Sequence, residues 1–271
     1  MNQSPVRYGF LLAAVTVLFA LAAGLGPDIP PLDVSTLVAP GTTAPEETLD
    51  HRFAEVRDGC GPHFEGLCAI ARTAATTTAP RAARLRVGVV LPIASTTILD
   101  DAGFAWYQIE WREWIRYPER VRTVWFVRAD TVVPLSFPDT EDTAATTSKR
   151  IVIDRSLQTL YAYEGDTLFL STRISTGLDL TPTPRGQFSV YLKTPSRYMQ
   201  GPLPGISDQY YDLPGVPWNL YFTKEGGAIH GAYWHNEFGR QWSHGCVNLP
   251  LDAARQLYDW TPVGTPVIVR D

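Results

Sequence analysis

Short apolar segments separated by turn residues run along most of this chain and restrict it to a fold made mainly of β-strands. Such segments occupy residues 85–90, 106–109, 124–127, 150–154, 159–163, 167–172, 186–192 and 266–270. They are rich in β-branched and aromatic residues, with glycine, proline or aspartate between many of them, as is typical of strands joined by turns. The sequence therefore predicts a mainly β protein.

One helix is predicted near the end of the chain. Ala254, Leu257 and Tyr258 fall on one face of a helix over residues 253–258, and Asp252 can cap it. Pro262 prevents the helix from continuing, because proline lacks the required backbone N–H. We expect this helix to pack behind the segment that carries Cys246.

The N-terminus predicts export. After Arg7, residues 8–25 form an uncharged apolar run, and residues 20–22 offer a small-x-small cleavage site. About eighteen residues is the borderline between a signal peptide and a membrane-spanning helix. Both alternatives, a cleaved signal or an uncleaved anchor over residues 1–26, place the rest of the chain outside the cytoplasm; a buried core helix is the third.

Composition predicts two domains joined by polar segments. With 45% hydrophobic and 19% charged residues, the chain of 271 residues can bury two modest cores. Residues 27–64 are interpreted as an extended tether rich in Pro, Thr and Ala at its start, and residues 138–148 as a linker with little apolar mass. The folded parts are then a small β-barrel at 65–137 and a C-terminal β domain at 149–271.

The three cysteines divide into a pair and a single thiol. Cys60 and Cys68 have seven residues between them and can form a disulfide in an oxidising compartment, although two unpaired thiols remain an alternative. A weaker alternative is a metal site formed by this pair together with His51 and His63. Cys246 is the cysteine left over.

Cys246 lies in the segment Ser243–Asn248, and Ser243 follows His230 by thirteen positions. A lone cysteine is usually a small buried hydrophobe, and a histidine beside a glycine is usually a turn residue. Here three of the chain's five histidines cluster near this cysteine. An ordinary thiol with a pKa of about 8.5 is little ionised at neutral pH, so a neighbouring imidazole is what a thiol nucleophile needs.

The segment Ser243–Asn248 together with His230 resembles the signature of the L,D-transpeptidase family with its YkuD-type catalytic domain. The resemblance extends from Lys149 to Asp271 and includes residues 183–186 and 264–267. The loop over residues 233–242 is shorter than is usual in that family. Residues 65–137 resemble bacterial Src-homology-3-like domains. The resemblance implies a small barrel followed by a β-sandwich-like catalytic domain with one helix near the active-site loop.

The resemblance also implies roles for individual residues. Cys246 would be the nucleophile, and His230 the base, oriented by the Gly231 carbonyl. The backbone N–H groups of Gly245 and Cys246, with that of His244, would stabilise the oxyanion; His244 has a direct role in proton transfer as its alternative. The remaining residues near the site, expected to contact substrate or hold its loops, are Ser243, Asn248, Tyr233 and Trp234.

The substrates implied are peptidoglycan stem peptides, one as acyl donor and one as amine acceptor, with no cofactor and no metal; carbapenem-type β-lactams would acylate the same cysteine. The net charge of −5 without a basic stripe argues against nucleic acid, and a membrane is involved only through an uncleaved N-terminus. Three alternatives remain. One is a secreted wall peptidase, carboxypeptidase or amidase. The second is a zinc enzyme using His230, His235, His244 and Cys246. The third is a wall-binding protein without catalysis.

Overall fold

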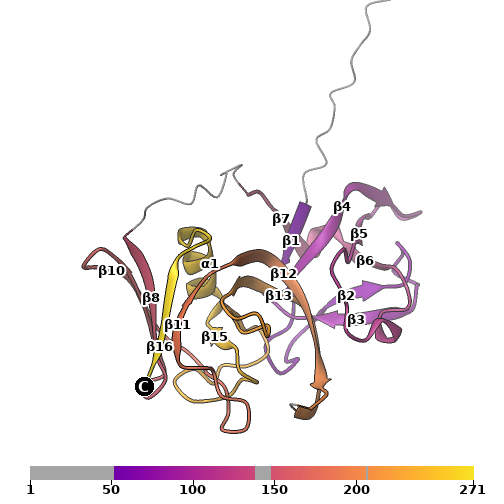
Figure 1. Cartoon of the computed structure of the whole chain (residues 1–271). Helices are drawn as coiled ribbons and strands as arrows, with labels where there is room; N and C mark the ends of the chain where they lie inside the picture. The colour runs from indigo at the N-terminus through magenta and orange to yellow at the C-terminus, as the bar shows by residue number, and fades with distance from the viewer. Residues whose placement is uncertain (1–51, 138–147, 206) are drawn as a thin grey trace, which may run out of the picture. The chain divides into compact units, whose positions relative to one another are not determined.

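The computed structural model describes residues 52–137, 148–205 and 207–271. In these ranges the chain forms three β-sheets and one α-helix, which confirms the mainly β prediction (Figure 1). The predicted signal or anchor segment, most of the tether and nearly all of the linker lie outside the described residues. Within the described ranges, no helix combines the length and apolar character that crossing a bilayer requires.

The N-terminal sheet has seven strands in the order β3-β2-β6-β5-β4-β1-β7. Their bounds are β1 Arg52–Val56, β2 Ala69–Arg72, β3 Arg81–Leu85, β4 Val90–Leu99, β5 Ala105–Ile109, β6 Trp125–Arg128 and β7 Val132–Leu135; short 3-10 turns lie at Pro118–Arg120 and Ala129–Thr131. The predicted tether to residue 64 is too long, because β1 already pairs with both β4 and β7. A disulfide joins Cys60 to Cys68. The likeness to Src-homology-3-like domains stays a prediction.

The C-terminal part contains a five-stranded sheet, β10-β9-β8-β16-β11, and a four-stranded sheet, β12-β13-β14-β15. The five strands are β8 Lys149–Asp154, β9 Thr159–Glu164, β10 Thr167–Arg173, β11 Gly186–Ser189 and β16 Pro266–Arg270; the four are β12 Leu192–Leu203, β13 Ser207–Tyr221, β14 Ala228–Gly231 and β15 Val247–Leu249. Side chains from both sheets and the helix build one buried core, since each element has an apolar face to cover.

Helix α1 spans Leu251–Trp260 and packs against β13, β14 and β10. It buries Ala254, Leu257 and Tyr258, the face that the sequence predicts. The predicted cap is wrong: Pro250 occupies the N-cap position without a side-chain hydrogen bond, and Asp252 lies in the first turn. An acidic side chain is favourable there because it faces the positive end of the helix dipole.

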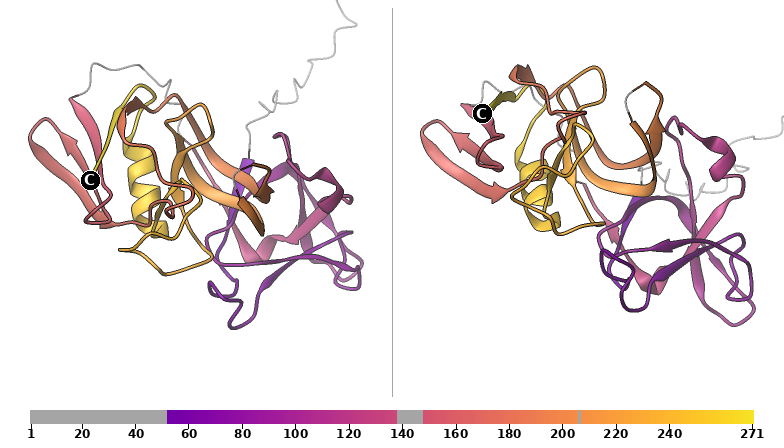
Figure 2. Two further views of the ribbon diagram at one scale, coloured as in Figure 1. Left: turned by 60° about the horizontal axis from the view of Figure 1, so that its bottom comes forward. Right: turned by 90° about the horizontal axis from the view of Figure 1, so that it is seen from below.

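Strands β12 and β13 form a long curved hairpin (Figures 1 and 2). The sequence predicts a lid or substrate-facing flap over residues 198–218, because this stretch is rich in proline, glycine and tyrosine and is too long for a simple turn. The structure instead pairs this stretch along most of its length and seats it on the N-terminal sheet, where Ser196 Oγ donates to Val90 O at 2.6 Å. Tyr198 and Val216 belong to the core of that sheet, so Thr48–Asp271 is one compact unit.

Candidate active site

Parallel strands bring the predicted base and nucleophile to the same edge of the four-stranded sheet. In the β14–β15 pair, Ile229 is the partner of Val247 and His230 the partner of Asn248. Cys246 directly precedes β15, so it lies beside the N-terminal end of β14. Both His230 and Cys246 line one cavity of about 160 Å³, which we call the base cavity.

The ring of His230 is buried and held in one orientation. Its Nδ1 lies 3.1 Å from the carbonyl oxygen of Gly231, and the residue is 2% exposed. A carbonyl only accepts, so Nδ1 carries the proton and Nε2 is left with a free lone pair. Burial lowers the pKa of His230 to about 4, so the ring is neutral at pH 7 and able to accept a proton.

The thiol of Cys246 is also neutral at rest. Burial raises its pKa, and a backbone hydrogen bond with Ala228 opposes this rise in part. The thiol lies 3.9 Å from Gly226 O, to which it can donate. A poorly solvated site disfavours both the thiolate and the imidazolium, so the resting pair is thiol and imidazole. Charge therefore develops only when a substrate is attacked.

Cys246 lies where two cavities meet. The second, of about 540 Å³, which we call the outer cavity, also contains Arg116, Tyr211 and Tyr221 in its lining. Burial, with a smaller contribution from Cys246, raises the pKa of Tyr211 to about 12, so its phenol stays protonated. A sulfur with open space on two sides can be reached by two different molecules in turn.

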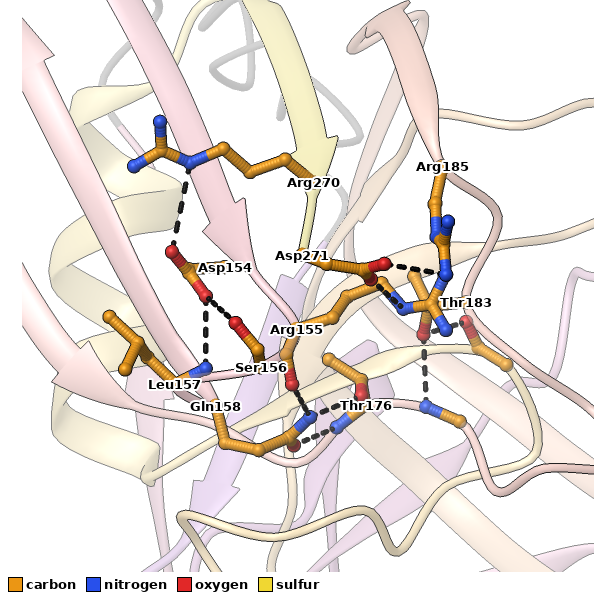
Figure 3. A network of polar contacts seen from close by, with 12 residues as sticks. Asp154, Arg155, Ser156, Leu157, Gln158, Thr176, Thr183, Arg185, Arg270 and Asp271 are labelled. Carbon is orange, nitrogen blue, oxygen red and sulfur yellow. Dashed lines mark hydrogen bonds and ion pairs between the residues drawn. The ribbon is translucent and has the colours of Figure 1, made fainter.

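The loop that carries Cys246 is anchored by side chains from the five-stranded side. Thr183 Oγ1 donates to Gly245 O at 2.8 Å and accepts from the N–H of Gly177 at 2.9 Å. Gln158 Nε2 donates to Thr176 Oγ1 (Figure 3). The Thr176 carbonyl accepts from the N–H of Ser243 at 3.0 Å. These contacts fix the backbone on which the nucleophile sits.

Ser243 holds the turn itself rather than facing open space. Its Oγ donates to Cys246 O at 2.5 Å and accepts from the N–H of Gly245 at 3.1 Å. Gly245 has φ +112°, a conformation that favours glycine. The predicted oxyanion donor Gly245 is therefore already occupied, whereas the N–H groups of His244 and Cys246 donate to no acceptor among the described residues.

His244 connects this loop to the β12–β13 hairpin. Its Nε2 lies 2.7 Å from Gln209 Oε1, and its ring stacks on Tyr211 with centroids 5.4 Å apart. Burial lowers the pKa of His244, so the neutral ring donates to Gln209 through Nε2–H. The side chain lines both cavities of Cys246 and thereby ties the hairpin to the active-site loop.

The two aromatic residues predicted to contact substrate line different cavities. Trp234 lines the base cavity, and its ring lies 5.8 Å from that of His230. Tyr233 is buried, donates to Pro214 O at 2.7 Å and packs in the core of the N-terminal sheet. It does not line the base or outer cavity.

His235, considered from the sequence as a zinc ligand, is in the structure a positioning residue. His235 is 1% exposed; its Nδ1 accepts from the N–H of Glu237 at 3.0 Å, and its Nε2 lies 2.8 Å from the side-chain amide of Asn248. Burial lowers its pKa to about 4, so the neutral ring carries its one proton on Nε2. The atom of Asn248 that faces Nε2–H must then be its oxygen.

In this orientation, the N–H groups of the Asn248 carboxamide have no acceptor among the described residues. The other amide atom of Asn248 is buried and has no hydrogen-bond partner among the described residues. Asn248 lines the base cavity. The unpaired amide atom is therefore a buried donor close to His230 and Cys246. The sequence signal was the motif residue Asn248 itself; its partner could not be identified without the fold.

We expect His230 and His235 to be opposite tautomers. Nitrogen-15 spectra of histidine-labelled protein at pH 7 should show the Nδ1–H form for His230 and the Nε2–H form for His235, because Gly231 O accepts from the first and Glu237 N–H donates to the second. His235→Ala identifies the second signal. An Nδ1–H form at His235 would contradict the orientation given for Asn248.

One alternative from the sequence is a zinc site formed by His230, His235, His244 and Cys246. Among the residues that the structure describes, no three His, Cys, Asp or Glu side chains are grouped so as to hold a metal ion. His230 and His235 use ring nitrogens to contact protein groups. This donor set does not form a zinc site as it stands.

Comparison with known proteins assigns the C-terminal part. The family described as the L,D-transpeptidase catalytic domain, YkuD, matches residues 148–269. YkuD of Bacillus licheniformis, named as an L,D-transpeptidase, is 28% identical over 44% of this chain and 64% of its own length. YqjB of Bacillus subtilis, named likewise, is 25% identical over 45% and 64%. The chain thus spans less than two thirds of either relative.

Among solved structures, the catalytic domain of an Enterococcus faecium L,D-transpeptidase acylated by ertapenem is 29% identical, with 45% of this chain and 96% of that chain covered and a TM-score of 0.40. The family match covers β8 through β16 together with His230 and Cys246. Residues 148–269 of this chain are therefore an L,D-transpeptidase catalytic domain of the YkuD family.

Proposed function

We propose that the protein cross-links peptidoglycan stem peptides through a thioester on Cys246. The observation that carries this proposal is the convergence of His230 and Cys246 on one cavity, with the acceptor nitrogen of the base fixed by Gly231 O. The family match over residues 148–269 supports the same reaction class.

In the first step the Cys246 sulfur attacks the carbonyl carbon of the donor peptide bond while its proton moves to Nε2 of His230. The N–H groups of His244 and Cys246 are the free donors for the oxyanion. Each such oxyanion donor is typically worth about 3 kcal/mol of transition-state stabilisation. The C–N bond then breaks, and the leaving amine takes the proton from His230.

In the second step an amine of another stem attacks the thioester carbonyl and gives its proton to His230. The C–S bond breaks, and the sulfur recovers that proton. The outer cavity supports this step, because Cys246 also lines this larger space and His230 does not. One molecule can then hold the acyl group in one cavity while the next approaches through the other.

We also propose that the protein works outside the cytoplasm, facing the cell wall. The Cys60–Cys68 disulfide supports this location, since structural disulfides persist mainly in oxidising compartments.

The test is incubation of the protein with a disaccharide-tetrapeptide. We expect an acyl adduct on Cys246 by peptide mass spectrometry, release of D-alanine and a cross-linked dimer. A carbapenem should form an adduct on the same residue and block the reaction. Release of hydrolysed tripeptide without any dimer would instead favour the carboxypeptidase alternative. Absence of any adduct would overturn the proposal.

A further inference from the structure

A further cavity, of about 220 Å³, lies outside the active site and contains three arginines in its lining: Arg84, Arg86 and Arg120. We call it the basic cavity. Asp212 is its acidic lining residue. The chain as a whole carries a net charge of −5, so this concentration of positive charge is a local feature. The proposed catalytic reaction does not use these three arginines.

The three arginines have no carboxylate partner in the described part of the chain. None of the ion pairs found there includes them. Arg120 donates to Gly201 O at 2.7 Å, while Nε of Arg86 is buried without any hydrogen-bond partner among the described residues. A buried guanidinium donor without an acceptor is costly and rare.

The nearby acidic groups are committed elsewhere. Asp212 accepts from Gln200 Nε2 at 2.9 Å and from the Tyr198 hydroxyl at 3.3 Å. Glu65 is near enough to act on Arg86 electrostatically, but its carboxylate accepts from the N–H of His63 at 2.7 Å. Neither carboxylate forms an ion pair with the arginines of the basic cavity.

Two of the guanidinium groups are pressed against the same aromatic ring. Their central carbons lie 3.9 Å (Arg84) and 3.7 Å (Arg86) from the centre of the Phe64 ring. Burial lowers the pKa of Arg86, and the charge of Arg84 lowers it further. An anion bound in the cavity beside Arg86 would offset this repulsion and offer an acceptor to the free Nε–H. Planar guanidinium groups match carboxylate and phosphate oxygens in pairs.

We propose that the basic cavity binds the oxyanion of an anionic cell-wall polymer, either a carboxylate or a phosphodiester. The anion site stands on the arginine geometry alone; its assignment to a wall polymer rests on the proposed function. The volume accommodates one such group with part of the sugar or glycerol unit that carries it.

The basic cavity lies next to the active site, and this position links anion binding to the reaction. Tyr233 lines it, and the next residue, Trp234, lines the base cavity. Their rings meet edge to face with centroids 5.1 Å apart. A polymer bound at the arginines is thereby held next to the active site. Such tethering raises the local concentration of attached stem peptides without changing the chemistry.

The test measures binding by the full chain with isothermal titration calorimetry at fixed ionic strength. Three probes are used: inorganic phosphate, a glycerol phosphate oligomer and a uronic acid oligomer. None contains a peptide, so their binding does not depend on the transpeptidase reaction. We expect millimolar binding of phosphate or tighter binding of one oligomer, and the oligomer that binds identifies the natural anion as phosphodiester or carboxylate.

Matched variants locate the site. Arg86→Gln should weaken binding at least about 10-fold, and Arg84→Gln several-fold, because each removes one positive charge from the cavity lining. Arg81→Gln, on the same strand β3 but outside the cavity lining, removes the same charge and should change the affinity less than about 2-fold. Arg84 is exposed, so its variant is expected to fold even if Arg86→Gln does not.

Two results would overturn the proposal. One is the absence of binding of all three probes to the wild-type chain. The other is an equal loss in Arg81→Gln and Arg84→Gln, since this would assign the binding to the general field of the surface. Failure of the muropeptide reaction with retained anion binding would overturn only the proposed function, and the reverse pattern only the anion site.

Discussion

Cys246→Ser is expected to abolish the acyl adduct and to lower the rate of cross-linking at least about 10⁴-fold. A serine hydroxyl has a far higher pKa than a thiol. The surroundings of Cys246 already disfavour the anion, as the raised pKa of the thiol indicates. The neutral imidazole of His230 cannot overcome this for an alcohol without further activation. The measurement is dimer formation from disaccharide-tetrapeptide, together with the mass of the peptide that contains residue 246.

The control for this variant is a check that the fold outside the side chain of residue 246 is unchanged. Ser243 and Thr183 contact the backbone carbonyl of residue 246, not its side chain, so the loop should keep its conformation in Cys246→Ser. The Cys60–Cys68 disulfide should also persist, and the thermal midpoint should change little. Wild-type turnover by Cys246→Ser would show that another group is the nucleophile.

His230→Gln is expected to lower kcat/KM by about 10²–10⁴-fold, the range that positioned general bases contribute. Glutamine fills part of the same volume and can donate to Gly231 O, but it has no basic nitrogen for the Cys246 proton. His244→Gln is the matched control. His244 is tied to Gln209 and Tyr211, so its replacement should loosen the hairpin and cost less than the loss of the base.

The pH dependence follows from the lowered pKa of His230. The active form of the base is the neutral ring, which is present above a pKa of about 4 and lost as the pH falls through that value. The acid limb of kcat/KM should thus lie near pH 4 instead of near 6.5, the ordinary value for histidine. His235 also has a pKa near 4, so the residual activity of His230→Gln must be measured as well. Persistence of the same acid limb in that variant would assign it to His235.

The sequence contains enough information for the strands of the five-stranded C-terminal sheet and for the helix. Their apolar residues recur with the periods of buried strands and of a helix face, and such periods are local properties. Strand β1 was missed because Arg52–Val56 is short, and only its pairing with the distant strands β4 and β7 makes it a strand. The β12–β13 hairpin was missed because prolines at 195, 202, 214 and 217 argue against strands in a local interpretation.

The sequence alone was enough to predict a nucleophile and a base, because a single thiol near several histidines restricts the choice. The tertiary structure alone decided how they are used. Parallel pairing of β14 with β15 brings Cys246 to His230, and Ser243 occupies the N–H of Gly245. Hydrogen-bond direction and desolvation depend on neighbours that are distant in the chain, which is why tautomers, free donors and the unpaired arginines could emerge only from the folded protein.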